Sequence, residues 1–139
     1  MKVIDGKDAV MGRLASYAVK EALKGEEIVI LNCDKVIITG SKKDIKDNFQ
    51  RKRSRVGSGQ KGPKHSRDSY MIVKRAIRGM VPNHRFGRGK IAFERIKCYN
   101  NIPKEFEGVK KIVGGKEVRS KFISVKELNK HNRGRLDNE

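Results

Sequence analysis

The apolar run Ile28-Val29-Ile30-Leu31 constrains the fold more than any other segment of the chain. Its four residues do not alternate with polar ones, and three are β-branched, so a strand formed here must be covered on both faces. Upstream, residues 3–5 form a short, mostly apolar segment that can be a first strand. Residues 10–23 carry apolar side chains at helical three- and four-residue steps. A strand, a helix and a buried strand in this order predict a βαβ unit and therefore an α/β fold.

The first helix has signals at both ends. Asp8 is expected to cap the amides at its start, and Gly25 is expected to end it, because glycine accepts the left-handed conformation common just past a helix. A further strand is predicted over residues 36–39. The spacing of Ser41 and Asp44 is that of a capping box, which predicts that a second helix begins there.

The rest of the chain predicts shorter elements. Helical periodicity marks residues 70–80, and a short helix over residues 91–96 is expected to lead into a strand near residues 97–99. Beyond Pro103, residues 121–125 are the one strand that we expect. Ser124 and Glu127 then predict the cap of a small terminal helix.

Positive charge is concentrated in the middle of the chain. The net charge is +18, and the segment from Lys42 to Lys97 holds 18 of the 34 Lys and Arg but only four acids, a local net of +14. Residues 56–68 contain three glycines and almost nothing to bury, which indicates a long basic loop. This asymmetry points to a polyanionic partner.

Other classes of protein are not favoured. The longest apolar runs are too short to cross a bilayer, and the start lacks the hydrophobic block of a secretory signal, so we expect a cytoplasmic protein with no membrane partner. Cys33 and Cys98 lie 65 positions apart without a Cys-x-x-Cys spacing. We therefore expect neither a disulfide framework nor a metal site, and no cofactor.

Two enzyme-like signals were weighed. Residues 57–62 match the dinucleotide-binding pattern G-x-G-x-x-G, but a basic run precedes them and Pro63 follows, where the fingerprint needs a strand and a helix. His65 and His84 lie among Lys and Arg without a catalytic motif. A nucleotide-dependent enzyme built on the βαβ unit remains the alternative. A DNA-binding regulator is a third hypothesis, although no helix-turn-helix spacing is present.

Aromatic residues accompany the basic ones. Phe49, Tyr70 and Phe93 fall on helical apolar stripes and are expected in the core. Phe86 has no periodic apolar neighbour, so it could stack on an unpaired base, insert against a ribose or anchor its loop.

Several segments together resemble a known family. In chain order they are Met11-Gly12-Arg13-Leu14-Ala15-Ser16, Ile38-Thr39-Gly40-Ser41, Gly62-Pro63-Lys64-His65 and Arg75-Ala76-Ile77-Arg78-Gly79-Met80-Val81-Pro82. With them the chain resembles the universal large-subunit ribosomal protein thirteen family, and Gly87-Arg88-Gly89-Lys90 and Glu94-Arg95-Ile96-Lys97 resemble its archaeal branch. The resemblance covers roughly residues 2–103.

The resemblance implies a three-layer α/β/α domain around a small, largely parallel or mixed sheet of about four strands, with basic loop extensions. It implies a structural constituent of the cytoplasmic large ribosomal subunit that clamps folded ribosomal RNA beside neighbouring ribosomal proteins. Neither catalysis nor a small-molecule substrate is expected. We expect residues 1–139 to form one domain, with a core of about 2–103 and a C-terminal extension over 104–139.

The resemblance, together with the charge, predicts which residues contact RNA. They are Lys42, Lys43, Arg51, Lys52, Arg53, Arg55, Lys61, Lys64, His65, Arg67, Arg75, Arg78, His84, Arg85, Phe86, Arg88 and Lys90. The neighbours of His65 are Lys64 and Ser66 rather than the aromatic residues of the archaeal pattern, which favours phosphate contact over stacking at this position.

Overall fold

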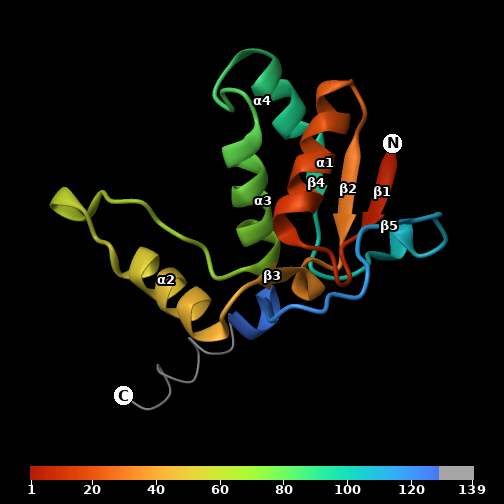
Figure 1. Ribbon diagram of the computed structural model, residues 1–139. Coiled ribbons are helices and arrows are strands. Elements are labelled where there is room, and N and C mark those ends of the chain that lie inside the picture. Colours follow the sequence, from red (N-terminus) through yellow and green to blue (C-terminus); the bar gives the residue numbers. More distant parts are fainter. Residues whose placement is uncertain (129–139) are drawn as a thin grey trace.

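A computed structural model of the chain describes residues 1–128 (Figure 1). Its main sheet has four strands in the order β4-β2-β1-β5. Their bounds are Lys2–Asp5 for β1, Ile28–Leu31 for β2, Ile96–Cys98 for β4 and Ile112–Val113 for β5. Every pairing in this sheet is parallel, so the predicted α/β class with a small, largely parallel sheet is confirmed.

A second sheet, of two strands, lies at the lower end of the molecule. Strand β3 (Ile37–Thr39) pairs antiparallel with β6 (Phe122–Ser124), and Ile38 lies opposite Ile123. The strand predicted over residues 36–39 therefore exists but stands outside the main sheet. Its partner β6 is the strand predicted over residues 121–125.

Strand β2 is buried on both faces, as its unbroken apolar run predicts. Ile28 and Ile30 point into the main hydrophobic core, whereas Val29 and Leu31 point to the opposite face. All four side chains are at most 3% exposed. The parallel strands β1 and β4 flank β2, so its backbone is paired on both edges as well.

Three helices cover one face of the main sheet. They are α1 (Met11–Leu23), α3 (Ser69–Met80) and α4 (Gly87–Glu94), and Figure 1 shows them side by side. The apolar stripe of α1 meets that of α3 over β2 and β4. On the other face lie the 3-10 helix η3 (Lys104–Phe106) and Tyr99, whose ring centroid is 5.8 Å from that of Phe106.

The helix ends differ in detail from the expectation. Asp8 does not cap α1: it sits in a left-handed turn with φ +58°, and its amide donates to the Lys35 carbonyl oxygen. Val10 occupies the cap position because its backbone forms a bridge to Ile37. Gly25 does follow α1 with φ +104°, as predicted.

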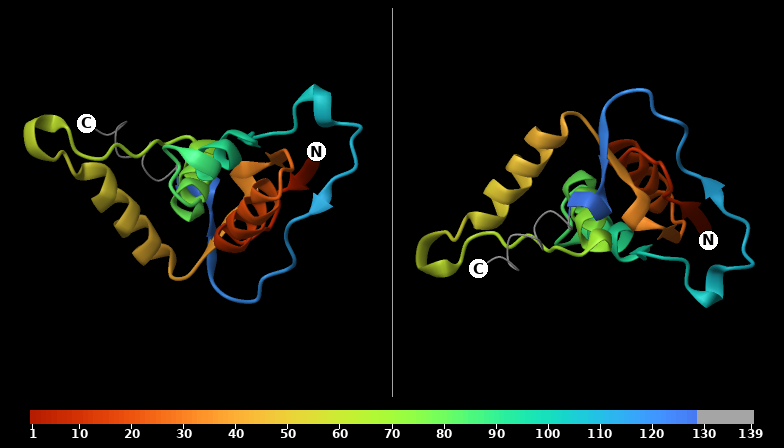
Figure 2. Two further views of the ribbon diagram at one scale, coloured as in Figure 1. Left: turned by 90° about the horizontal axis from the view of Figure 1, so that it is seen from above. Right: turned by 90° about the horizontal axis from the view of Figure 1, so that it is seen from below.

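Helix α2 (Lys42–Ser54) projects from the body. Ser41 precedes it, as predicted, but its hydroxyl makes no capping hydrogen bond. The helix has no buried residue, and only Ile45 and Phe49 pack against the core. With the following loop, which contains the 3-10 turn η2 (Ser58–Gln60), it forms an arm of residues 42–68 that extends away from the body (Figure 2).

Two elements depart from the sequence analysis. Helix α4 begins at Gly87, four residues earlier than predicted, so the glycine-spaced basic patch forms its first turn. Gly89 allows this start, because a Cβ there would lie 1.6 Å from the Pro82 carbonyl oxygen. Strand β5 was not predicted, since its two residues stand exposed among Lys and Gly with no periodic pattern.

The C-terminal part begins as predicted. The Glu127 amide donates to the Ser124 hydroxyl over 3.2 Å, and residues 125–128 are helical. Val125 and Leu128 are buried in the main core. The rest of the predicted extension, residues 129–139, lies outside the described residues. Within residues 1–128, no helix combines the length and apolarity needed to span a bilayer.

Strand pairing brings the two cysteines together despite their distance in sequence. Cys33 opens the 3-10 turn η1 (Cys33–Lys35) just after β2, and Cys98 ends β4 beside it. Both thiols are free. A hydrogen bond with Cys98 and burial together raise the pKa of Cys33, which keeps this thiol protonated and unreactive.

Candidate nucleic-acid interface

The ion pairs within residues 1–128 lie at the N-terminal end of the structure. The Met1 amino group is 3.5 Å from Glu26, and Glu21 pairs with Lys2 and, at 3.0 Å, with Lys24. None of the bases from Lys64 to Lys90 has a carboxylate partner among the described residues. Their charge is therefore left to attract an external anion.

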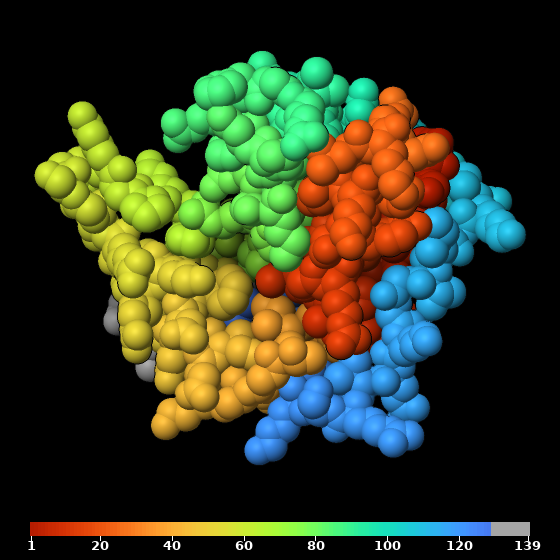
Figure 3. All heavy atoms as spheres, turned by 45° about the horizontal axis from the view of Figure 1, so that its top comes forward, coloured from red at the N-terminus to blue at the C-terminus, as the bar shows by residue number. Residues whose placement is uncertain are grey.

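The segments that carry these bases follow one another along one edge of the molecule. Figure 1 shows the arm, then α3, then the turn of residues 81–86 that leads into α4, while β5 lies at the opposite edge. Figure 3 shows the arm standing off the body, with the atoms of α3 and α4 beside it across an indentation. We call this series of segments the basic edge.

Two arginines, one on the arm and one on α3, hold the loop of the arm in place. Arg53 donates from Nη2 to the Ser66 carbonyl oxygen over 3.4 Å, and Arg75 donates from Nη1 to the Lys64 carbonyl oxygen over 3.4 Å. Burial, and secondarily Arg67, lowers the pKa of Arg53. These contacts hold residues 64–66 against α3 and α2.

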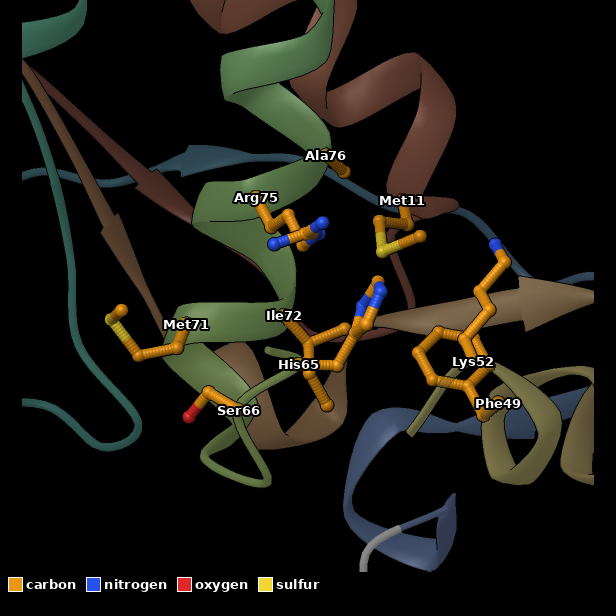
Figure 4. A pocket seen from close by; sticks show the side chains of 9 residues that line it. All are labelled: Met11, Phe49, Lys52, His65, Ser66, Met71, Ile72, Arg75 and Ala76. Atoms are coloured by element: carbon orange, nitrogen blue, oxygen red, sulfur yellow. The ribbon is translucent and has the colours of Figure 1, made fainter. Parts of the chain in front are cut away.

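A hollow of about 180 Å³ lies where the arm meets the body (Figure 4). We call it the arm hollow. It joins the start of α1, the middle of α2, the loop and the first half of α3, and its lining residues are Met11, Phe49, Lys52, His65, Ser66, Met71, Ile72, Arg75 and Ala76. Segments far apart in sequence thus contribute to one site, which no local motif could indicate.

His65 stands inside the arm hollow, near Arg75 and Met11 (Figure 4). Partial burial lowers its pKa, and the nearby charges of Arg75 and Lys52 lower it further. The imidazole is therefore neutral at pH 7. A phosphate bound at the rim would offset these charges and raise that pKa.

A second hollow opens on the other side of the loop. Its cationic lining is Arg53, Arg55 and Lys64, the neutral His65 also lines it, and its volume is about 380 Å³. The loop folds back on itself here: Gly57 has φ +72°, and the Gly62 amide donates to the Val56 carbonyl oxygen over 2.8 Å. Helix α2, not a strand, precedes this turn, so the strand that the dinucleotide-binding fingerprint needs does not stand before it.

The turn before α4 forms the far end of the basic edge. Phe86 is 67% exposed, so its side chain is not buried, which does not support the alternative that it anchors its loop. The Arg85 amide donates to the Asn83 Oδ1 over 3.3 Å, and Gly87 follows with φ +72°. Arg85, Arg88 and Lys90 are all exposed around Phe86.

The structure does not bring all the predicted site residues together. Lys42 and Lys43 begin α2 and line a separate hollow beside Lys121, the residue before β6. Residues 84–90 lie at the opposite end of α3 from the arm. Among the other predicted residues, Arg51 and Lys61 are exposed on the arm, and Arg78 lies on α3 at intermediate exposure.

Sequence reasoning missed several residues that lie on the basic edge or line a hollow. Lys74 lies on α3 with its Nζ 5.2 Å from the Phe93 ring centroid, and its position beside Arg75 was the available signal. Met11 and Lys121 were not indicated, because their neighbours in space come from distant parts of the chain. The expectation that Phe49, Tyr70 and Phe93 pack against the core is confirmed.

Comparison with known proteins gives a consistent answer. A protein from Thermoplasma volcanium named large ribosomal subunit protein uL13 is 40% identical over 135 residues, which cover 94% of this chain and 96% of that protein. The protein of the same name from Methanocaldococcus jannaschii is 41% identical over 134 residues, with the same two coverages.

The same name belongs to a protein from Methanococcus maripaludis that is 41% identical over 133 residues, or 92% of this chain and 94% of that protein. The family model described as ribosomal protein L13 matches residues 1–105, close to the range over which the sequence motifs suggested a resemblance. The chain therefore belongs to the ribosomal protein L13 family.

Proposed function

We propose that the basic edge binds folded large-subunit ribosomal RNA and holds several of its segments together. As a member of its family, the protein is a structural constituent of the large ribosomal subunit rather than an enzyme, and it is cytoplasmic. The alternative of a nucleotide-dependent enzyme is not supported.

One observation carries this proposal. The bases from Lys64 to Lys90 have no carboxylate partner within residues 1–128, and the segments that carry them follow one another along one edge of the molecule (Figure 1). Each base that neutralises a phosphate releases condensed counterions, which favours binding. A-form RNA is recognised mainly through its shape, backbone and 2′-hydroxyl groups, so a spread of cations on a rigid body suits it better than a short sequence-reading element.

The proposed contacts divide between two platforms. The arm brings Lys52, Arg55 and Lys64 to one RNA segment. The turn before α4, with Arg85 and Phe86, and the first turn of α4, with Arg88, face another, and α3 with Arg75 and Arg78 lies between them. Neighbouring ribosomal proteins are proposed to contact the opposite edge, where Val113 of β5 is 80% exposed.

A salt titration of binding to large-subunit ribosomal RNA tests the proposal. The quantity measured is the slope of the logarithm of the binding constant against the logarithm of the salt concentration, called the salt slope below. A triple variant, Arg85→Gln, Arg88→Gln and Lys90→Gln, should reduce the size of this slope by roughly 2 to 3, since each phosphate contact contributes about 0.7 to 0.9 to it. The matched control replaces three exposed lysines near the opposite edge, Lys104, Lys110 and Lys116, by Gln. If both triple variants reduce the slope equally, the basic edge is not the RNA site.

A further inference from the structure

The arm hollow differs from a simple cationic patch because much of its lining is apolar. Met11, Phe49 and Ile72 line it together with Ala76, while Lys52, His65 and Arg75 contribute its charged and polar groups. A phosphate backbone alone needs only the cations. Apolar lining beside cations suits a ligand that has both a flat, weakly polar part and a negative charge.

The size of the hollow fits such a ligand. Its volume is about 180 Å³, whereas an apolar protein cavity of about 150 Å³ already accommodates a benzene ring. Lys52 lies with its Nζ 5.8 Å from the Phe49 ring centroid, so its ammonium stands next to the apolar lining. A ring in contact with Phe49 would thus have a cation beside it for an attached phosphate.

His65 supplies polar groups within the hollow. No hydrogen bond from residues 1–128 reaches its imidazole, although the side chain is partly buried. A neutral imidazole offers one donor and one acceptor, which match the mixed donors and acceptors on the edge of a nucleobase. Inorganic phosphate would leave both this ring and the apolar lining unused.

We propose that the arm hollow receives one unstacked nucleotide of the ribosomal RNA, with its base against Phe49, His65 and Ile72 and its phosphate between Lys52 and Arg75. This inference rests on the proposed function, because it requires RNA along the basic edge. Recognition of RNA through unstacked bases held against aromatic side chains is a general mode, and the hollow gives it a location on this protein.

Filling the hollow tests the inference without removing any charge. Ala76→Leu places a larger side chain in the space, and Ala76→Ser at the same position leaves it open. Ala76→Leu should weaken binding to large-subunit ribosomal RNA at least about fivefold, the effect of losing one base contact. The salt slope should stay unchanged, and Ala76→Ser should bind like the wild type. Unaltered affinity of a folded Ala76→Leu protein would overturn the inference.

Lys52→Gln separates failure of this inference from failure of the proposed function. If RNA lies along the basic edge, Lys52→Gln should lower the salt slope by about 0.7 to 0.9, whether or not a base occupies the hollow. An effect of Lys52→Gln without an effect of Ala76→Leu would therefore exclude the nucleotide but retain the RNA interface. If Lys52→Gln and the triple variant at residues 85–90 both bind like the wild type, the proposed function fails too.

Photocrosslinking gives a second readout that does not depend on a variant folding. The wild-type protein bound to large-subunit ribosomal RNA is irradiated with short-wave ultraviolet light, and the nucleotide adducts are mapped by mass spectrometry. The inference predicts an adduct at Phe49, His65 or Met71. Adducts confined to residues 85–90 and to the tip of the arm would contradict it.

Discussion

Gly89 gives the sharpest test of how the basic edge is built. A Cβ at this position would lie 1.6 Å from the Pro82 carbonyl oxygen and 2.7 Å from the Asn83 carbonyl oxygen. Real Cβ contacts are essentially never shorter than 3.0 Å, so α4 or the turn before it must move by more than an ångström in Gly89→Ala. The clashing atoms belong to the backbone, so no side chain can rotate to relieve the contact. The nearby Ala92 of α4 is only 1% exposed, so the helix has little free space to move into.

Overpacking of this kind costs about 1–3 kcal/mol, and we expect the upper end because backbone atoms cannot rotate away. A loss of about 3 kcal/mol would lower the Tm by roughly 10 °C for a chain of this size. Gly79→Ala is the matched control: it lies in α3 and meets nothing within 4 Å. That change should instead stabilise the fold by about 0.5–1 kcal/mol, since glycine is the poorer helix former.

Thermal and urea unfolding followed by circular dichroism measure both variants. The midpoint should shift while the urea m-value stays constant, which indicates that stability rather than the extent of unfolding has changed. The reasoning would be refuted if Gly89→Ala were as stable as the wild type, or if both variants shifted in the same direction.

Two further predictions concern pH. Burial and nearby cations lower the pKa of His65 below its ordinary 6.5, so the unfolded chain binds more protons at this residue than the folded chain does. The free energy of unfolding should therefore fall as the pH drops below about 6.5. His65→Gln should flatten this part of a plot of the urea midpoint against pH. Hydrogen bonds from Lys2 and then Lys24 lower the pKa of Glu21, so its stabilising effect should be present above its ordinary pKa of 4.5 and disappear in acid. Glu21→Gln should then unfold more easily than the wild type at neutral pH, and an equal difference between the two in acid would contradict this assignment.

Local patterns predicted most of the elements because burial imposes a period on them. The unbroken run of β2 reflects its position between two buried faces, and the stripe at three- and four-residue steps in α1 reflects a single buried face. Where the pattern was weak, prediction failed. Strand β5 has no apolar period, and the start of α4 at Gly87 depends on the close approach of Gly89 to Pro82.

The site was predictable in composition but not in geometry. The basic segment identified the arm and the turn before α4, yet nothing local indicated that Met11 and Ala76 would line a hollow with Phe49 and His65. Nor could the sequence show that Lys42 and Lys43 would stand apart near Lys121. Helix capping failed at Asp8 for a related reason, because the bridge between Val10 and Ile37 determines where α1 begins.

The sequence alone thus determined the α/β class and the family and predicted a polyanionic partner, because burial period, charge density and short motifs are properties of neighbouring residues. The tertiary structure decided which cations share a surface and which side chains enclose the arm hollow. Both features depend on how separate helices pack and on where the arm folds back. The residues that meet in this way are far apart along the chain, and no local sequence pattern indicates that they are close in space.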